Sequence, residues 1–166
     1  FIAIENARLL SELHQKNEAL TQAHAQVTEA LDQQTATSEI LRVISSSPTD
    51  VQPVFHAIAA SAVRLCVAEN ASVWRLEGER LLLVASQGSD AQLVHADVGR
   101  YSVTVDPTTV TGRCAVEART VHVEDLRAAA AEAEFPAGHA ASLRRGHRTL
   151  LSVPLMREGK VIGIIT

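Results

Sequence analysis

The stretch that decides the fold is Arg148–Thr166, RTLLSVPLMREGKVIGIIT. Successive side chains of a strand point to opposite faces. If the first half of this stretch is a strand, one of its faces carries Leu151, Val153 and Leu155. The polar segment Arg157–Lys160 follows and contains a glycine, which adopts positive φ at little cost. The stretch therefore predicts a β-hairpin.

The second strand of this hairpin has the character of a central strand. Val161–Ile165 is apolar on both faces apart from Gly163, as is typical of a strand that is covered above and below. Pro154 lacks an N–H group, so we expect it beside a bulge or an unpaired side of the sheet. Because the chain stops at Thr166 in mid-strand, we expect the sequence to be a piece of a longer protein.

Composition narrows the class of protein. Hydrophobic residues make up 46% of the 166 residues and aromatic residues only 3%, which indicates an aliphatic core. The net charge of −4 and the lack of a basic cluster argue against nucleic-acid binding. No apolar run approaches the roughly 20 residues that span a bilayer, so we expect no membrane insertion in this segment. Cys66 and Cys114 lie far apart, which favours reduced thiols and a cytoplasmic location.

The first 47 residues predict one long helix, because they contain neither proline nor glycine and are rich in good helix formers. Two columns of apolar residues recur at intervals of seven: Leu13, Leu20, Val27 and Leu41 in one, and Ile2, Leu9, Ala23, Ala30 and Ile44 in the other. This pattern is typical of a coiled-coil seam and predicts a parallel homodimer. Lys16, Gln34 and Thr37 interrupt the columns and weaken the seam. The alternative is that the helix packs on its own domain.

Beyond the Ser45–Asp50 break, helices and strands are mixed, which predicts an α+β class. We expect helices over 51–67, 110–118 and 139–145, strands over 71–76, 81–86, 101–105 and 120–123, a turn with a short helix over 87–97, and a helix or loop over 127–134. Cys66 falls on the apolar face of the first of these helices, so we expect it to be buried.

The segment Val110–Leu126, VTGRCAVEARTVHVEDL, together with the hairpin and the long helix, resembles the GAF domain. The matching pieces are the T-G-R helix, the R-T-V-H-V strand and the terminal strand pair, and the match covers about Pro48–Thr166. The resemblance implies an antiparallel sheet of five or six strands with flanking helices and a small-molecule pocket on one side. Similar domains stand in tandem in bacterial sensor histidine kinases and nucleotide cyclases.

The resemblance also divides the chain. Residues 33–48 look like the linker that leads into such kinase-associated domains, and Phe1–Leu9 looks like the closing helix of a preceding domain of the same type. We therefore expect a signalling helix over 1–47, whose residues 1–10 end a preceding GAF domain. A GAF domain truncated before its own closing helix then covers 48–166.

A ligand site is expected at the start of the T-G-R helix. Thr108, Thr109 and Thr111 lie there, and the fold implied by the resemblance brings Arg113 and Arg148 nearby. Backbone amides and the helix dipole at such a position favour an acidic ligand. The ligand itself and any cofactor stay unidentified.

A few residues of the sequence are candidates for catalysis or for metal binding. His122-Val123-Glu124 has the H-x-E form of a zinc deaminase, but the P-C-x-x-C that completes such a metal site is missing. No phosphate-cradling glycine loop occurs. Cys114 lies near a helix N-terminus that could lower its pKa, which leaves a redox or covalent role open. His139 and His147 flank a short helix and either contact an anion or haem iron or face solvent.

The sequence thus favours a non-catalytic regulatory module that binds a small ligand or partner. Its dimeric helix would relay the signal to a histidine kinase or cyclase domain in the same chain. The alternative is a structural dimerisation and spacer module without a ligand. A free methionine sulfoxide reductase of this fold comes third, because that activity needs several suitably placed cysteines and Cys66 and Cys114 do not supply the pattern.

Overall fold

The computed structural model describes residues 2–46, 50–89 and 98–166. The chain forms two compact units, Phe1–Arg42 and Val43–Thr166. None of the helices in the described residues is both long enough and apolar enough to cross a membrane.

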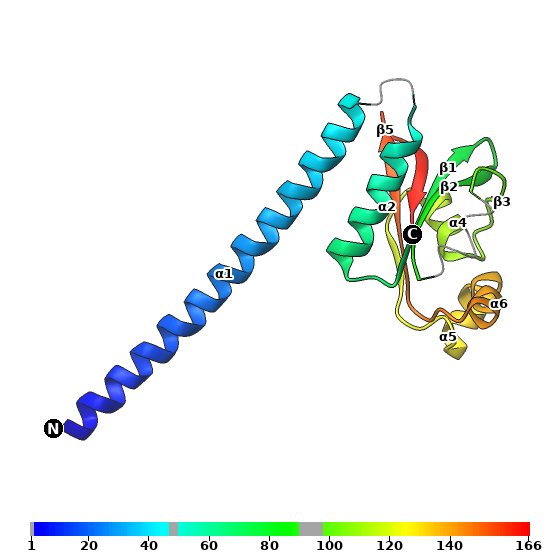
Figure 1. Cartoon of the computed structure of the whole chain (residues 1–166). Helices are drawn as coiled ribbons and strands as arrows, with labels where there is room; N and C mark the ends of the chain where they lie inside the picture. Colours follow the sequence, from blue (N-terminus) through cyan, green and yellow to red (C-terminus); the bar gives the residue numbers. More distant parts are fainter. Residues whose placement is uncertain (1, 47–49, 90–97) are drawn as a thin grey trace. The chain divides into compact units, whose positions relative to one another are not determined.

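The first unit consists of the helix α1 (Ile2–Ser46), which is continuous over 45 residues (Figure 1). At ~1.5 Å per residue its length is about 67 Å. The long helix expected from the sequence is confirmed. The apolar residues of its first column are more than half exposed, with Leu20 reaching 68%. The pairing of two such helices stays a prediction.

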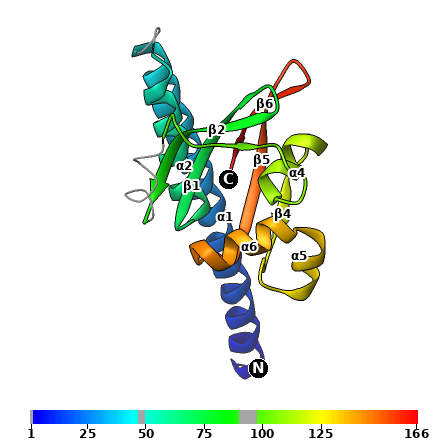
Figure 2. The same ribbon diagram turned by 90° about the vertical axis from the view of Figure 1, so that its right-hand side faces the viewer.

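The second unit is built on one antiparallel sheet of six strands. They are β1 (Asn70–Glu77), β2 (Arg80–Gly88), β3 (Ser102–Thr104), β4 (Val121–Val123), β5 (Leu150–Arg157) and β6 (Lys160–Ile165). Their order across the sheet is β3-β2-β1-β6-β5-β4 (Figure 2). The expected α+β fold with a sheet of five or six strands is confirmed. The terminal hairpin lies inside this order, with β6 next to β1 and β5 between β6 and the edge strand β4, so it joins β4 to the other strands.

Two details of the hairpin follow from its sequence. β4 pairs with residues 150–152 of β5, so Pro154 lies beyond the end of this pairing and its missing N–H is not needed there. A register irregularity follows between Leu155 and Met156. On β6, a Cβ atom at Gly163 would lie 2.4 Å from the carbonyl oxygen of Trp74. Only glycine allows β6 to approach β1 so closely.

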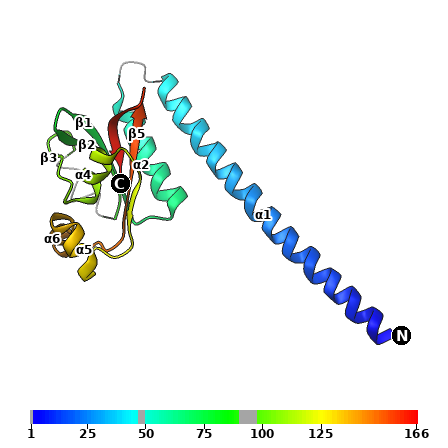
Figure 3. The same cartoon turned by 180° about the vertical axis from the view of Figure 1, so that it is seen from behind.

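Helices cover the two faces of the sheet. The helix α2 (Gln52–Cys66) packs on β1 and β2, where Ala59 contacts a small core with Val73, Val84 and Ala85. On the opposite face lie α4 (Val110–Glu117), α5 (Ala129–Glu134) and α6 (Pro136–Arg145), with α5 and α6 side by side (Figures 2 and 3). The larger core lies between these helices and the sheet and contains Trp74, Leu83, Cys114, Phe135 and Ile164.

The structure differs from the sequence-based expectations at Cys66 and in the bounds of several elements. Cys66 is exposed rather than buried, because it is the last residue of α2 and the chain turns away at Val67. β2 continues through Gly88, and the remainder of the expected turn and short helix, residues 90–97, lies outside the described residues. The segment 127–134 contains the helix α5, and α6 begins at Pro136 rather than at His139.

Candidate functional site

The start of α4 is fixed by a tight turn around Asp106. The Thr108 N–H and hydroxyl both donate to Asp106 Oδ1, at 2.8 and 2.7 Å. Thr109 is the N-cap of the helix: its Oγ1 accepts from the Gly112 N–H at 3.0 Å and donates to the Asp106 carbonyl oxygen at 2.8 Å. The hydroxyl groups of Thr108 and Thr109 thus hold the helix start in place.

The side chain of Thr111 points to the sheet rather than to this turn. Its hydroxyl lies 3.4 Å from that of Ser152 and 3.3 Å from that of Thr166, and these two hydroxyls are 3.2 Å apart. Ser152 is fully buried. The three hydroxyl groups tie the first turn of α4 to the middle of the sheet.

The guanidinium group of Arg113 joins α4 to α5. Its Nη1 lies 2.6 Å from Glu134 Oε1, Nη2 donates to the Glu134 carbonyl oxygen at 2.8 Å, and Nε donates to the Pro107 carbonyl oxygen at 3.1 Å. Its Cζ lies 4.1 Å from the centre of the Phe135 ring, a cation–π contact. Arg113 therefore has a structural role, and its side chain is only 19% exposed.

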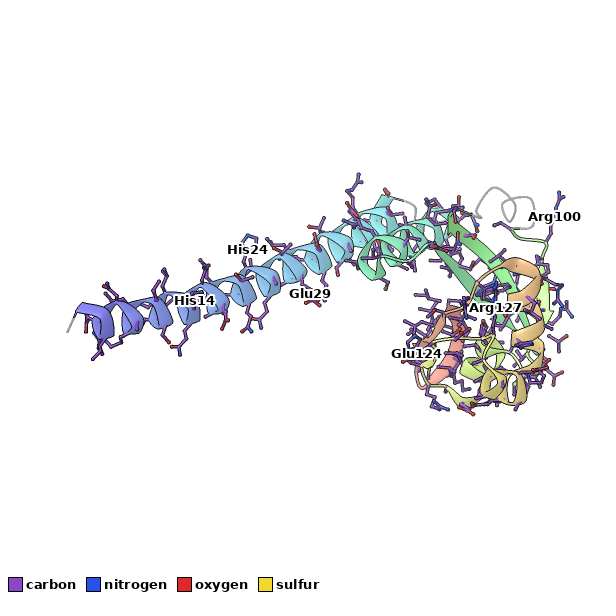
Figure 4. All side chains as sticks on the ribbon, turned by 90° about the horizontal axis from the view of Figure 1, so that it is seen from below. His14, His24, Glu29, Arg100, Glu124 and Arg127 are labelled. Carbon is purple, nitrogen blue, oxygen red and sulfur yellow. The ribbon has the colours of Figure 1, made fainter. Side chains whose placement is uncertain are left out.

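Arg148 lies in a different group of charges. It donates to both carboxylate oxygens of Asp125, with the shorter distance 2.6 Å, and these bonds lower the pKa of Asp125. Arg127, labelled in Figure 4, also contacts this pair. Its backbone N–H donates to Asp125 Oδ1, and its Nη2 donates to the Gly146 carbonyl oxygen. The structure brings Thr108, Thr109 and Arg113 together at α4, whereas Arg148, in the segment between α6 and β5, binds Asp125 in the loop after β4.

The Asp106 turn gives a testable pH dependence. The two bonds from Thr108 lower the pKa of Asp106 below its ordinary value of 3.8. A depressed pKa in the folded state contributes stability that is present above the unfolded-state value and is lost as the pH falls through the folded-state value. We expect acid unfolding curves measured between about pH 5 and pH 2 to be less steep for Asp106→Asn. An unchanged slope in this variant would contradict the assignment.

Cys114 lies on α4 with no exposed surface. Burial raises the pKa of its thiol to about 11, and Arg119 offsets this only in part. The lowering that its place near a helix N-terminus suggested is therefore wrong, because desolvation of the buried thiol outweighs the favourable charge of Arg119. This environment disfavours the thiolate that a redox or covalent role requires.

The two cysteines should differ sharply towards a thiol reagent. Cys66 is exposed and Cys114 is buried, so we expect one thiol per folded chain to react at pH 8 and the second only after unfolding. Ellman titration with and without denaturant measures this. In Cys66→Ser the rapid reaction should disappear, whereas rapid labelling that survives this change would show that Cys114 is accessible.

The histidines of the described residues lie apart from one another. His139 Nδ1 lies 2.8 Å from the Leu126 carbonyl oxygen and is half-buried, and His122 is exposed on β4. His14 lies on α1 with Nδ1 2.9 Å from the Leu10 carbonyl oxygen (Figure 4). Within residues 2–46, 50–89 and 98–166, no group of three or more His, Cys, Asp or Glu residues is placed to hold a metal ion.

A groove of about 530 Å³ lies between β4 and α5. Three of its lining residues, Val121, Ala131 and Phe135, are buried and apolar, and Glu124, which is exposed, also lines it. None of the residues expected to bind a ligand lines it. Sequence reasoning missed this groove because its two walls are separate segments, and the pattern of 127–134 did not settle between helix and loop.

Comparisons with known proteins give one result about family. A family model described as GAF domain matches residues 48–166. A comparison with curated proteins finds no match.

Solved structures with the same fold are distant in sequence. The GAF domain of an Acinetobacter phosphoenolpyruvate-protein phosphotransferase is 20% identical, with a TM-score of 0.58 over 80% of this chain and 73% of that one. The GAF domain of the Coxiella burnetii phosphoenolpyruvate-protein phosphotransferase is 15% identical, with a TM-score of 0.61 over 82% and 76%. Free methionine-R-sulfoxide reductase from Neisseria meningitidis, in complex with its substrate, is 18% identical, with a TM-score of 0.59 over 83% and 72%. These likenesses concern the fold alone.

Proposed function

The chain belongs to the GAF domain family, and we propose that it is a cytoplasmic regulatory module that relays a signal along α1 to an output domain. The observation that carries this proposal is the continuous 45-residue helix with exposed apolar columns, which precedes a domain of this family in the sequence. A helix of this length exceeds what the packing of one small domain requires. The output domain would be a histidine kinase or nucleotide cyclase in the same polypeptide.

The proposed ligand site is the first turn of α4, with Thr108, Thr109, Thr111 and Arg113, and with Arg148 as a further cation. An acidic small molecule is the class that amide groups and a helix dipole favour. The contacts of the Thr111 hydroxyl with those of Ser152 and Thr166 support a link from this site to the sheet, because a displacement of α4 would disturb them.

Thermal unfolding in the presence of candidate anions tests the ligand proposal. The probes are inorganic phosphate, citrate, and nucleoside mono- and triphosphates, including cyclic nucleotides. A ligand whose free concentration is a hundred times its Kd stabilises a folded protein by about 2.7 kcal/mol, which raises Tm by several degrees in a chain of this size. We expect Arg148→Gln to reduce the shift and Arg144→Gln, an exposed arginine of α6, to leave it unchanged. No shift with any probe would contradict the site.

The proposed relay is a change in the pairing of two α1 helices. Coupling between sites is typically worth 1–3 kcal/mol, and a seam interrupted by Lys16 and Gln34 is weak enough to respond to it. Replacing both residues by leucine should lock the seam and abolish the response of the full-length parent to its stimulus. An unchanged response would contradict the relay.

A spacer module without a ligand is the second candidate. The observation in its favour is that Thr108, Thr109 and Arg113 already have internal hydrogen-bond partners. Under this alternative the anion probes give no shift and α1 still pairs. A reductase activity like that of the Neisseria meningitidis protein is the least supported, because Cys114 is buried and Cys66 lies at the end of α2.

A further inference from the structure

The outer edge of β4 is an open end of the sheet. β4 is the last strand in the order, and its only strand neighbour among the described residues is β5. Beside β4 lies the groove of about 530 Å³ that residues of β4 and α5 line. An uncovered edge strand presents unpaired backbone N–H and C=O groups, which can pair with a strand of another chain.

The sequence around β4 is complementary to itself in the antiparallel direction. β4 spans Val121–Val123, and an antiparallel pair that extends it over Arg119–Asp125, RTVHVED, centred on His122, sets Val121 opposite Val123 and Arg119 opposite Asp125. Apolar residues then meet apolar residues, and opposite charges meet at both ends. Centring the pair on Val121 instead would set Arg119 opposite Val123, so the pattern selects one register.

The side chains are available for this pairing. His122 and Glu124 are exposed, and the side chain of Arg119 is 63% exposed. Arg119 is held by an exposed ion pair with Glu117 at 2.5 Å, and pairs of this kind contribute little to stability. Asp125 binds Arg148 but keeps further lone pairs on its two carboxylate oxygens.

We propose that the β4 edge is a homodimer interface, in which β4 of a second copy of this chain pairs antiparallel to it about a twofold axis at His122. The two six-stranded sheets then continue into one, and each copy contributes the same surface. This interface is separate from the α1 seam and does not rest on the function proposed above.

Disulfide trapping in the full 166-residue chain tests this interface. In a Cys66→Ser background, His122→Cys places two cysteines opposite each other, with Cα atoms about 4.5–5.5 Å apart, within the range of Cα separations that a disulfide spans. The matched control is Thr104→Cys, which is exposed at the other edge of the sheet on β3. We expect His122→Cys to cross-link at least about tenfold faster than the control at the same protein concentration. Equal rates would overturn the proposal.

The control also separates the two interfaces. Pairing through α1 would tether two α/β units and raise both cross-linking rates together, so the ratio of the rates reports β4 alone. Adding Arg119→Glu, which sets like charges opposite each other, should lower the His122→Cys rate to that of the control, whereas Arg119→Lys should preserve it. A rate that does not respond to Arg119→Glu would contradict the proposed register.

Amide hydrogen exchange of the unmodified chain provides a test that needs no variant. Raising the protein concentration should slow exchange in residues 119–125 and leave residues 102–104 of β3 unchanged. Exchange in residues 119–125 that is independent of concentration, up to the solubility limit, would overturn the proposal.

Discussion

The Gly112→Ala variant is expected to lose about 4 kcal/mol or more of the free energy of unfolding, which is exceptional for the addition of one methyl group. A Cβ atom at Gly112 would lie 2.0 Å from the carbonyl oxygen of Asp106 and 2.6 Å from its carbonyl carbon. These are backbone atoms, and the same carbonyl oxygen accepts the bonds from the Thr109 N–H and hydroxyl. The turn must therefore open before the methyl group fits.

Denaturant unfolding followed by the fluorescence of Trp74, the single tryptophan of the chain, measures this loss. Gly78→Ala is the matched control, because Gly78 has φ +59° but no atom within 4 Å of a Cβ. This control should lose only about 1 kcal/mol, the cost of positive φ for alanine. If the two variants lose the same free energy of unfolding, the close contact of Gly112 with the Asp106 carbonyl group is not the reason for a glycine at this position.

The Leu20→Lys variant is expected to dissociate the α1 pair. Leu20 is 68% exposed in the single chain, and burial of one leucine from each helix contributes about 3–6 kcal/mol per dimer. The loss of this free energy should raise the dimer dissociation constant by roughly a hundredfold or more. In an Arg119→Glu background, which removes pairing at the β4 edge, sedimentation equilibrium should give twice the mass of 17.8 kDa without the α1 change and a monomer-like mass with Leu20→Lys at equal concentration.

Ala25→Lys is the matched control for this change. It adds the same charge to an exposed position of α1, but outside both apolar columns. Its dissociation constant should stay close to that of the unmodified chain. Equal weakening in the two variants would show that charge, rather than the apolar seam, controls association.

Short-range patterns predicted most of the fold. The alternation in residues 150–155 and the glycine turn predicted the hairpin, and the β-branched run of 161–165 predicted that its second strand lies inside the sheet. The apolar face of the first strand is less covered than its pattern suggests, because Leu151 and Val153 are 41% and 37% exposed. The lack of proline and glycine predicted α1. Cys66 was misplaced because helical periodicity does not say where the covering sheet ends.

The candidate site was less predictable. The threonines at the start of α4 signal a helix cap, and the sequence does not tell whether their hydroxyl groups bind a ligand or the neighbouring backbone. The structure shows internal bonds for Thr108 and Thr109. Arg113 bonds to Glu134, 21 residues away, and Arg148 pairs with Asp125, 23 residues away. Contacts over such distances follow from tertiary packing, which local patterns do not encode.

Spin labels on α1 test the central claim, that two copies pair in parallel and in register, most directly. In a Cys66→Ser background, Gln15→Cys and Gln33→Cys are labelled separately, and the distance between the two copies of each label is measured by dipolar spectroscopy. A parallel pair in register gives a short distance at both positions. In an antiparallel pair the distance grows by ~3 Å for each residue between the label and the crossing point, so at least one of the two positions gives about 27 Å or more, and unpaired helices give no defined distance. Either of these last two results would contradict the account.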